Sequence, residues 1–322
     1  MKTARRALLC AALIAAAAPS LAADPWPAWA YPVNPPGMQP VPDDGVARRV
    51  PNSTAAFTLT QIRDLFKAPD WHPGDHPPMP DIVATGRKPG VLACGYCHLP
   101  NGLGRPENSS LAGLPAEYIV QQVLDFRSGA RRSSEPASLP VNLMIAVSKA
   151  VSDDELKVAA GYFAALQPRP WIRVLETDSV PKTHVAGWML VASEPHETEP
   201  VGPRIIEMPE DLERTELRDS TSGFIAYVPR GSIARGKALA EGAGGRTACA
   251  VCHGSDLRGL GPVPALAGRS PSYIVRQLYD MRRGVRNGSW SALMQPVVTE
   301  LSIEDMVALA AYTASLAPSP GR

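Results

Sequence analysis

Two five-residue frames constrain this chain more than any other feature of its sequence. Residues 94–98 read Cys-Gly-Tyr-Cys-His and residues 249–253 read Cys-Ala-Val-Cys-His, 155 positions apart. The same offset relates segments 111–122 and 266–277, which share Leu-Ala-Gly and Tyr-Ile-Val, and the offset drops to 150 further along. Self-similarity of this kind predicts two copies of one domain, the second lacking five residues in a loop.

The residue types of the two frames indicate their chemistry. Cys-x-x-Cys-His is the attachment pattern of c-type haem. Two thiols on one helical turn reach the two vinyl groups of the porphyrin as thioethers, and the adjacent histidine is held under the iron as an axial ligand. We therefore predict two covalently attached haem c groups, with His98 and His253 as iron ligands. The predicted attachment residues are Cys94, Cys97, Cys249 and Cys252.

Three other uses of the four cysteines fit less well. Disulfides would leave the two histidines unexplained. A zinc site with four cysteine ligands would join two pairs that lie 155 residues apart, far outside the spacing of zinc ribbons. A thioredoxin-like redox pair requires a neighbouring βαβ pattern, which the sequence lacks.

The first residues of the chain have the pattern of an export signal. Residues 1–23 combine a basic start, an apolar stretch over 7–18 and small residues up to Ala22 and Ala23. The apolar stretch is too short for a membrane anchor. Removal of this predicted signal peptide takes three positive charges away, so the formal net charge changes from +1 to −2. Nothing in this balance favours nucleic acid as a partner.

The proline content limits helix length. The chain has 34 prolines, so we expect short helices joined by stiff loops. In the first copy one helix is predicted to begin near Pro115 and another at the capping box of Ser152. In the second copy the corresponding starts are Pro271 and Ser302. The apolar stripes of these helices are interpreted as the walls of the haem pockets.

The sixth iron ligand is predicted from repeat equivalence. A methionine thioether opposite the histidine closes the iron and raises its potential, which is typical of a carrier. Met144 and Met294 are the repeat-equivalent methionines, at the 150-residue offset, and we predict that they are iron ligands. Four histidines are alternatives, each interpreted as a solvated loop residue because none recurs in both copies: His72, His76, His184 and His196.

These motifs together resemble the tandem two-haem class I cytochromes c of the c-four type. The resemblance covers about 85–167 and 233–317 and includes the segment Pro-Ala-Leu-Ala-Gly at 264–268. It implies two all-α cytochrome c folds with His/Met iron and one-electron transfer in the periplasm. It also implies that a proline carbonyl accepts from the ring of the axial histidine, a role that Pro264 matches.

In the first copy Ser109 stands at the position of Pro264. The acceptor there is left open, with a carbonyl around Pro106 as the alternative. A carbonyl that accepts from the imidazole fixes the orientation of the ring and thereby affects the reduction potential of the iron. We therefore expect two unequal haem potentials.

The predicted fold is mainly α, with two tandem cytochrome c-like all-α domains, a β-containing bridge and a proline-rich N-terminal strap. The strap is rich in Trp, Tyr and Pro, and we expect it to lie extended along the protein's own surface, with docking of a partner enzyme as the alternative. The bridge has β character near its start and acidic, proline-broken stretches such as 207–216. The predicted divisions are signal peptide 1–23, strap 24–57, first copy 58–170, bridge 171–229 and second copy 230–322.

Two functions follow, of which we expect the first. The chain would carry single electrons from a periplasmic dehydrogenase or a quinol-oxidising complex to a terminal oxidase or another cytochrome, without bond chemistry of its own. The alternative is a haem enzyme, peroxidase-like or acting on a small substrate, with an open first haem. That alternative requires that Met144 is not a ligand and that His72 or His76 approaches the first haem.

Overall fold

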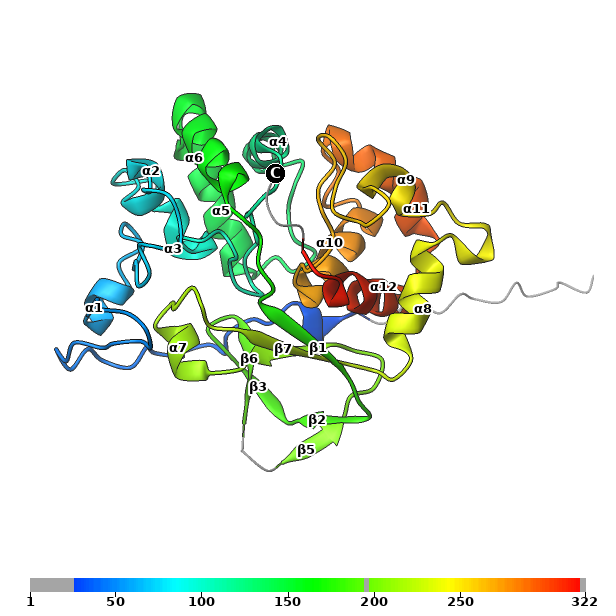
Figure 1. Ribbon diagram of the computed structural model, residues 1–322, viewed down its shortest axis with the longest axis horizontal. Coiled ribbons are helices and arrows are strands. Elements are labelled where there is room, and N and C mark those ends of the chain that lie inside the picture. The colour runs from blue at the N-terminus through cyan, green and yellow to red at the C-terminus, as the bar shows by residue number, and fades with distance from the viewer. Residues whose placement is uncertain (1–25, 194–196, 319–322) are drawn as a thin grey trace, which may run out of the picture.

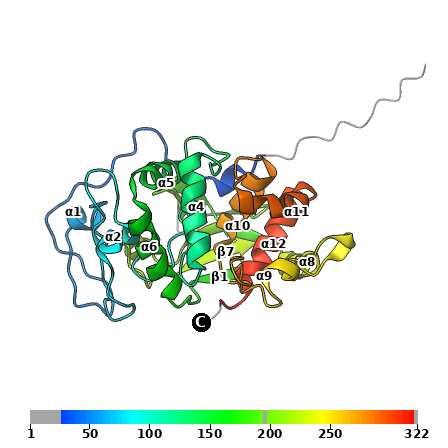
Figure 2. The same cartoon turned by 90° about the horizontal axis from the view of Figure 1, so that it is seen from above.

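The computed structural model of the chain describes residues 26–193 and 197–318 (Figure 1). The predicted signal peptide 1–23 and His196 lie outside the described residues. Two groups of helices stand above a small sheet, the first group at one end of the molecule and the second at the other (Figures 1 and 2). The structure is therefore mainly α with small sheets, as expected. No helix in the described ranges is both long and apolar enough to cross a membrane.

Two helices of the first copy begin at a side-chain cap. Thr58 and Ser152 each form a capping box, at the start of the first and the last of these helices. The helices are α1 (Leu59–Ile62), α2 (Asp81–Ala84), α3 (Cys94–His98), α4 (Ala116–Ser128), α5 (Leu139–Ala150) and α6 (Asp153–Ala165). Ile119 and Val123 of α4 are buried against Phe163 of α6 in the core of this copy.

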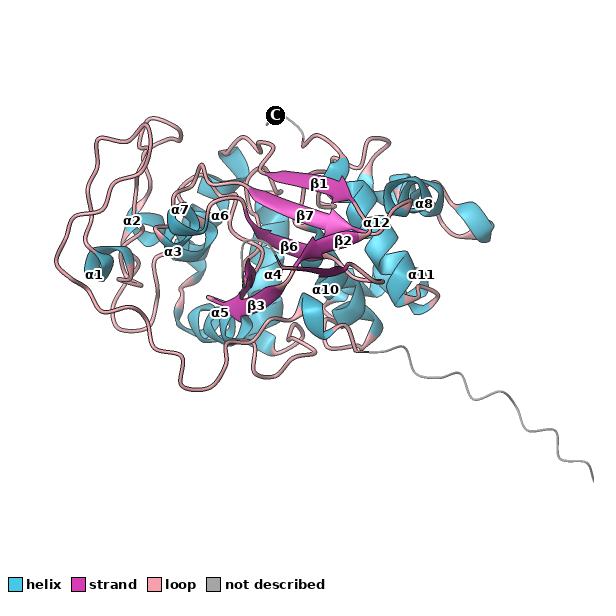
Figure 3. Ribbon diagram, turned by 90° about the horizontal axis from the view of Figure 1, so that it is seen from below, coloured by secondary structure: helices cyan, strands magenta, loops and turns pink. Residues whose placement is uncertain are grey.

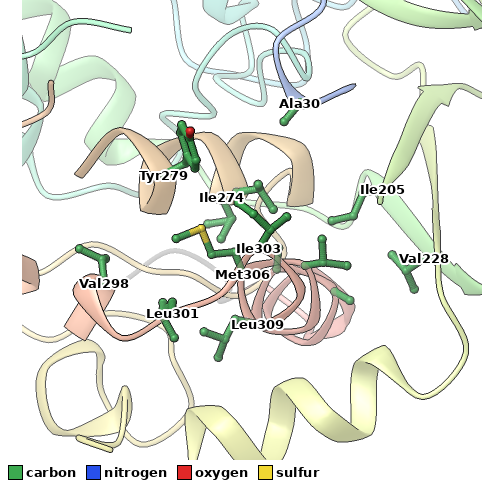
Figure 4. Close-up of a cluster of buried hydrophobic side chains, with 14 of the residues drawn as sticks. Ala30, Ile205, Val228, Ile274, Tyr279, Val298, Leu301, Ile303, Met306 and Leu309 are labelled. Atoms are coloured by element: carbon green, nitrogen blue, oxygen red, sulfur yellow. The ribbon is translucent and has the colours of Figure 1, made fainter. Parts of the chain in front are cut away.

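The second copy repeats this arrangement of helices, and its first and last helices are in close contact. Its elements are α8 (Ser232–Ala240), η2 (Ala243–Gly245), α9 (Ala250–His253), α10 (Pro271–Arg282), η3 (Ser289–Met294), α11 (Gln295–Thr299) and α12 (Ile303–Ser315). Ser302 forms the predicted capping box of α12. Gly236 permits the contact of α8 with α12, because a Cβ there would lie 1.9 Å from the carbonyl oxygen of Ala308. Figure 4 shows Ile274 of α10 beside Met306 of α12 in this core.

The strands of the bridge join both cores. In its main sheet, β7 (Phe224–Val228) lies between β1 (Ile172–Glu176), which is parallel to it, and β6 (Ile206–Pro209), which is antiparallel (Figure 3). Two hairpin-like pairs complete the bridge: β3 (Thr183–Ala186) with β4 (Met189–Ala192), and β2 (Ser179–Pro181) with β5 (Thr198–Pro200). Phe224 belongs to the first core and Val228 to the second.

The acidic, proline-broken stretch 207–216 forms regular structure. This segment contains most of β6 and the short helix α7 (Leu212–Glu216), whose N-cap Asp211 accepts from the backbone N–H of Arg214 at 3.0 Å. Asp211 and Glu213 lie at the start of α7, where carboxylates are favourable.

The strap lies on both copies. Val50, near its end, is buried with Ile62 and Trp71 of the first copy, whereas its start packs on the second copy. Tyr31 stacks on Trp26 at 4.7 Å between ring centroids and packs edge-on against Tyr279 of α10. Its hydroxyl donates to Asp280 at 2.7 Å. Ala30, in η1 (Ala28–Ala30), is buried in the second core (Figure 4). The strap thus covers the protein's own surface, and docking of a partner enzyme on it stays a prediction.

Candidate haem sites

Each Cys-x-x-Cys-His frame forms a short helix that presents its residues together. In the first copy the whole frame is α3, and in the second Cys249 is the N-cap of α9. All four predicted attachment cysteines are free thiols. Burial raises the pKa of the Cys94 thiol to about 12, so that thiol is neutral at pH 7.

The two histidines are held in the same way. Nδ1 of His98 lies 2.8 Å from the carbonyl oxygen of Ser109, and Nδ1 of His253 lies 2.8 Å from that of Pro264. Because a carbonyl oxygen only accepts, Nδ1 carries the proton in both rings, and the lone pair of Nε2 is left to bind a metal. Burial lowers the pKa of both histidines, which favours the neutral ring that iron requires.

The acceptor in the first copy is therefore Ser109, not a carbonyl around Pro106. The Pro106 carbonyl instead accepts from the guanidinium of Arg276. The match of Pro264 to its implied role agrees with the structure.

The two predicted methionine ligands lie in different secondary structure. Met144 is in the middle of α5, and Met294 ends η3 directly before α11. Both are partly buried, and each packs against the hydrophobic core of its own copy. Each methionine thus lines the interior of the copy that holds the corresponding histidine.

The interpretation of His72 and His76 as solvated loop residues is wrong. The His76 side chain is buried, with Nε2 3.2 Å from Asp70 and Nδ1 2.9 Å from the Pro77 carbonyl. Nε2 of His72 lies 2.9 Å from the buried carboxylate of Asp219. His184 is exposed, as expected.

The residue after each axial histidine has a positive φ. Gly254 has φ 83° and its equivalent Leu99 has φ 62° with ψ 154°. A side chain is strained in this region, and glycine is not. The first frame thus contains local backbone strain that the second avoids.

The bridge covers the first frame, a contact that sequence reasoning did not predict. The Arg218 guanidinium lies 3.7 Å from the ring centroid of Tyr96 and donates to the Tyr96 carbonyl at 2.8 Å. Arg105 donates to the carbonyl of Thr215 in α7 at 3.1 Å, and Asn101 donates to the carbonyl of Ser220 at 2.6 Å. We call residues 212–220 the cap of the first site. No local signal predicts it, because its partners lie more than 100 residues away in sequence.

A second unpredicted feature joins the two copies. Arg131 and Arg286 pair in an isolated antiparallel β-bridge. Arg131 donates to Tyr273 at 2.9 Å, and Arg286 donates to the equivalent Tyr118 at 2.9 Å. Both guanidiniums also share the side-chain oxygens of two equivalent glutamines, Gln122 and Gln277. The 155-residue offset relates all three pairs, so the repeat itself contained the signal.

No protein-family model matches the chain. Cytochrome c-554(548) of Halomonas halodenitrificans is 43% identical over 68 residues, which are 21% of this chain and 82% of that protein. Cytochrome c4 of Azotobacter vinelandii is 26% identical over 231 residues, 70% of this chain and 85% of that protein. The chain belongs to the di-haem cytochromes c of the c4 type.

A further relative of this di-haem type is the thiosulfate dehydrogenase electron acceptor of Stutzerimonas stutzeri. It is 27% identical over 234 residues, which are 72% of this chain and 82% of that protein. The cofactors of a c4-type chain are two covalently attached haem c groups. The geometry above fits that cofactor, because each frame combines two free thiols with one histidine whose Nε2 lone pair is available.

Proposed function

We propose that this chain is a single-electron carrier that passes electrons between redox proteins through two His/Met haems. The observation that carries the proposal is the matched pair of histidines, each bonded through Nδ1 to a carbonyl 11 residues downstream. Such an acceptor holds the ring in one tautomer and one orientation, which a ligand to iron needs. When bound, haem iron supplies a reversible one-electron couple, and the chain's own residues set its ligands and surroundings.

Each copy would supply one complete ligand set. Cys94 and Cys97 would attach the first haem and Cys249 and Cys252 the second. His98 with Met144, and His253 with Met294, would be the axial pairs. The boundaries 58–170, 171–229 and 230–322 for the first copy, bridge and second copy are part of this proposal.

The partner is proposed to be a periplasmic dehydrogenase. One similar protein is named as the electron acceptor of thiosulfate dehydrogenase, which supports an enzyme of this general class as electron donor. Export through the predicted signal peptide 1–23 would bring the chain to the compartment where c-type haem is attached. The enzyme alternative, which required His72 or His76 at the first haem, gains no support. Both ring nitrogens of His76 have other partners, and Nε2 of His72 lies 2.9 Å from Asp219.

The test is the visible and near-infrared spectrum of the oxidised holoprotein, with and without cyanide. We expect two low-spin haems, a methionine-to-iron charge-transfer band and no change on addition of cyanide. Met144→Ala and Met294→Ala should each remove about half of that band and create one cyanide-binding haem, because an open sixth position admits an external ligand.

The two variants serve as matched controls for each other. A wild-type protein with one high-spin haem that binds cyanide or reacts with peroxide would contradict the carrier and make the first haem an active site. An unchanged band in the Met144→Ala variant would reject Met144 as a ligand.

A further inference from the structure

The bridge buries one carboxylate between the two copies. Glu207 of β6 is 3% exposed. Ile205, two positions earlier, is buried in the second core (Figure 4). A carboxylate removed from water is costly unless its charge is paired and its oxygens are hydrogen-bonded. The ligand sets of the proposed carrier do not include this group, so its surroundings need their own explanation.

The two oxygens of Glu207 are in different situations. Oε2 accepts from the hydroxyl of Ser270 at 2.7 Å, and from the backbone N–H of Ser272 at 3.0 Å and the hydroxyl of that residue. Oε1 is buried and has no hydrogen-bond partner among the described residues. An ionised carboxylate requires a donor at this oxygen, and a neutral carboxyl with its proton there requires an acceptor.

A small cavity adjoins Glu207. The volume open to the centre of a water molecule is about 10 Å³, which is room for one water. Because a water molecule both donates and accepts, one at this place serves Oε1 in either protonation state. The strap, the first copy, the bridge and the second copy all contribute to the lining, which includes Trp29, Pro106, Trp188, Glu207 and Arg276.

Little charge compensates Glu207. Arg276 is the other charged residue in the lining, and its guanidinium donates to a backbone carbonyl of the strap at 2.8 Å and to one of the first copy. Arg269, next to Ser270, donates to the first copy. The lining residues from the strap, the first copy and the β3–β4 turn are uncharged. Burial therefore raises the pKa of Glu207, although the serine donors and Arg276 act in the opposite direction.

Glu207 lies between the loops that hold the two axial histidines. Pro106, which lines the cavity, is three positions before Ser109, the acceptor for the first histidine. Ser270, which donates to Glu207, is six positions after Pro264, the acceptor for the second. An electron added at either site therefore acts on this carboxyl through protein of low dielectric constant and favours its neutral form.

We propose that Glu207 is a redox-linked proton site, which binds a proton when the chain is reduced and releases it when the chain is oxidised. The electron that the redox partner supplies reduces one iron from Fe(III) to Fe(II). A proton from solvent forms an O–H bond at Oε1, so that the carboxylate becomes a neutral carboxyl, and oxidation reverses both changes. This inference rests on the proposed carrier function and adds that the chain takes up protons together with electrons.

The first experiment is a redox titration of the full mature holoprotein, repeated between about pH 5 and 8, where a buried glutamate titrates. The reduction potential of the wild type should fall as the pH rises, because the carboxylate favours oxidised iron. Glu207→Gln should remove this dependence. Glu210→Gln, at an exposed carboxylate of the same bridge, is the matched control and should keep it. A dependence that survives in Glu207→Gln would overturn the proposal and assign it to another group, such as a haem propionate.

Two further measurements do not need the Glu207→Gln protein. Ser272→Ala removes one donor to the carboxylate, so the pH dependence should move to higher pH. The infrared difference spectrum of the wild type, reduced minus oxidised, should gain a carbonyl band of a protonated carboxyl that shifts in D₂O. Absence of that band, or a Ser272→Ala titration identical to that of the wild type, would overturn the proposal.

These outcomes are separable from failure of the carrier function. A protein that is not a two-haem carrier would show an open haem in its cyanide spectrum before any redox titration. A sealed two-haem spectrum combined with potentials that do not depend on pH would leave the carrier function intact and reject the role of Glu207 alone.

Discussion

At the scale of single residues, a backbone carbonyl holds each axial histidine, whichever residue it belongs to. The resemblance implied a proline carbonyl, and the first copy has Ser109 where the second has Pro264. The distance from Nδ1 to the carbonyl oxygen is nevertheless 2.8 Å in both copies. Every residue has a carbonyl, so the loop geometry, and not the residue type, supplies this acceptor.

A residue-scale difference between the sites is the buried cation of Arg218. Burial lowers the pKa of its guanidinium, which stays protonated at pH 7. We predict that Arg218→Gln lowers the reduction potential of the first haem, because a nearby cation disfavours the oxidised iron. The expected effect is on the order of 1 kcal/mol, or tens of millivolts. A redox titration measures it.

Arg173→Gln is the control for that titration, since Arg173 forms an exposed ion pair with Glu210 in the bridge. An Arg218→Gln protein with unchanged potentials would show that the cap covers the first site without tuning it.

At the scale of secondary-structure elements, short-range sequence signals predicted helix starts correctly, whereas the packing of a loop was not predicted. The capping boxes of Ser152 and Ser302 are confirmed, because a cap depends on residues three positions apart. His76 was interpreted as a solvated loop residue, but its loop, 71–80, packs against α6 through a hydrogen bond of 3.1 Å between Tyr162 and His76. Loop packing of this kind involves residues 86 positions apart, so no local pattern predicts it.

This loop should respond to pH. The hydrogen bond that the His76 ring donates to the Asp70 carboxylate raises the pKa of His76, with Asp75 adding to the effect, while Tyr162 stays neutral because burial raises its pKa. Because the pKa of His76 is higher in the folded than in the unfolded protein, protonation of His76 stabilises the fold. This stabilisation is fully present below the unfolded pKa of about 6.5 and is lost as the pH rises through the folded pKa. We therefore predict faster amide hydrogen exchange in 71–80 above neutral pH, after correction for the intrinsic rate.

His76→Gln should remove this pH dependence, whereas His184→Gln, at an exposed histidine, should keep it. A pH dependence that survives in His76→Gln would assign it to another group, such as His72.

At the scale of the whole molecule, the two copies meet through equivalent residues. Arg131 and Arg286 lie next to each other and are tied to the tyrosine and glutamine of both copies. Burial would raise the pKa of Tyr273, but the two neighbouring guanidiniums outweigh it and lower that pKa. The junction is thus a network of polar groups in which each side chain has a partner in the other copy, although Nε of Arg286 is buried without one.

Loss of one member should therefore be costly. We predict that Arg286→Gln lowers the free energy of unfolding by about 2 kcal/mol, because Tyr118 loses its guanidinium donor and Gln122 keeps only Arg131. Denaturant unfolding of the holoprotein, followed by circular dichroism, measures the change.

Arg283→Gln is the matched control, at an exposed arginine three positions earlier, and should change stability by less than about 0.5 kcal/mol. Equal effects of the two variants would refute a stabilising role for the junction.

The sequence by itself determined the repeat, the attachment frames and the helix starts, because each depends on residues that are close together or related by one constant offset. Only the tertiary structure decided that the bridge caps one site and leaves the other open. The contact between Arg218 and Tyr96 spans 122 positions, and its counterpart in the second copy does not exist among the described residues. Two nearly identical frames thus acquire different surroundings, because long-range packing depends on the segments outside the repeat.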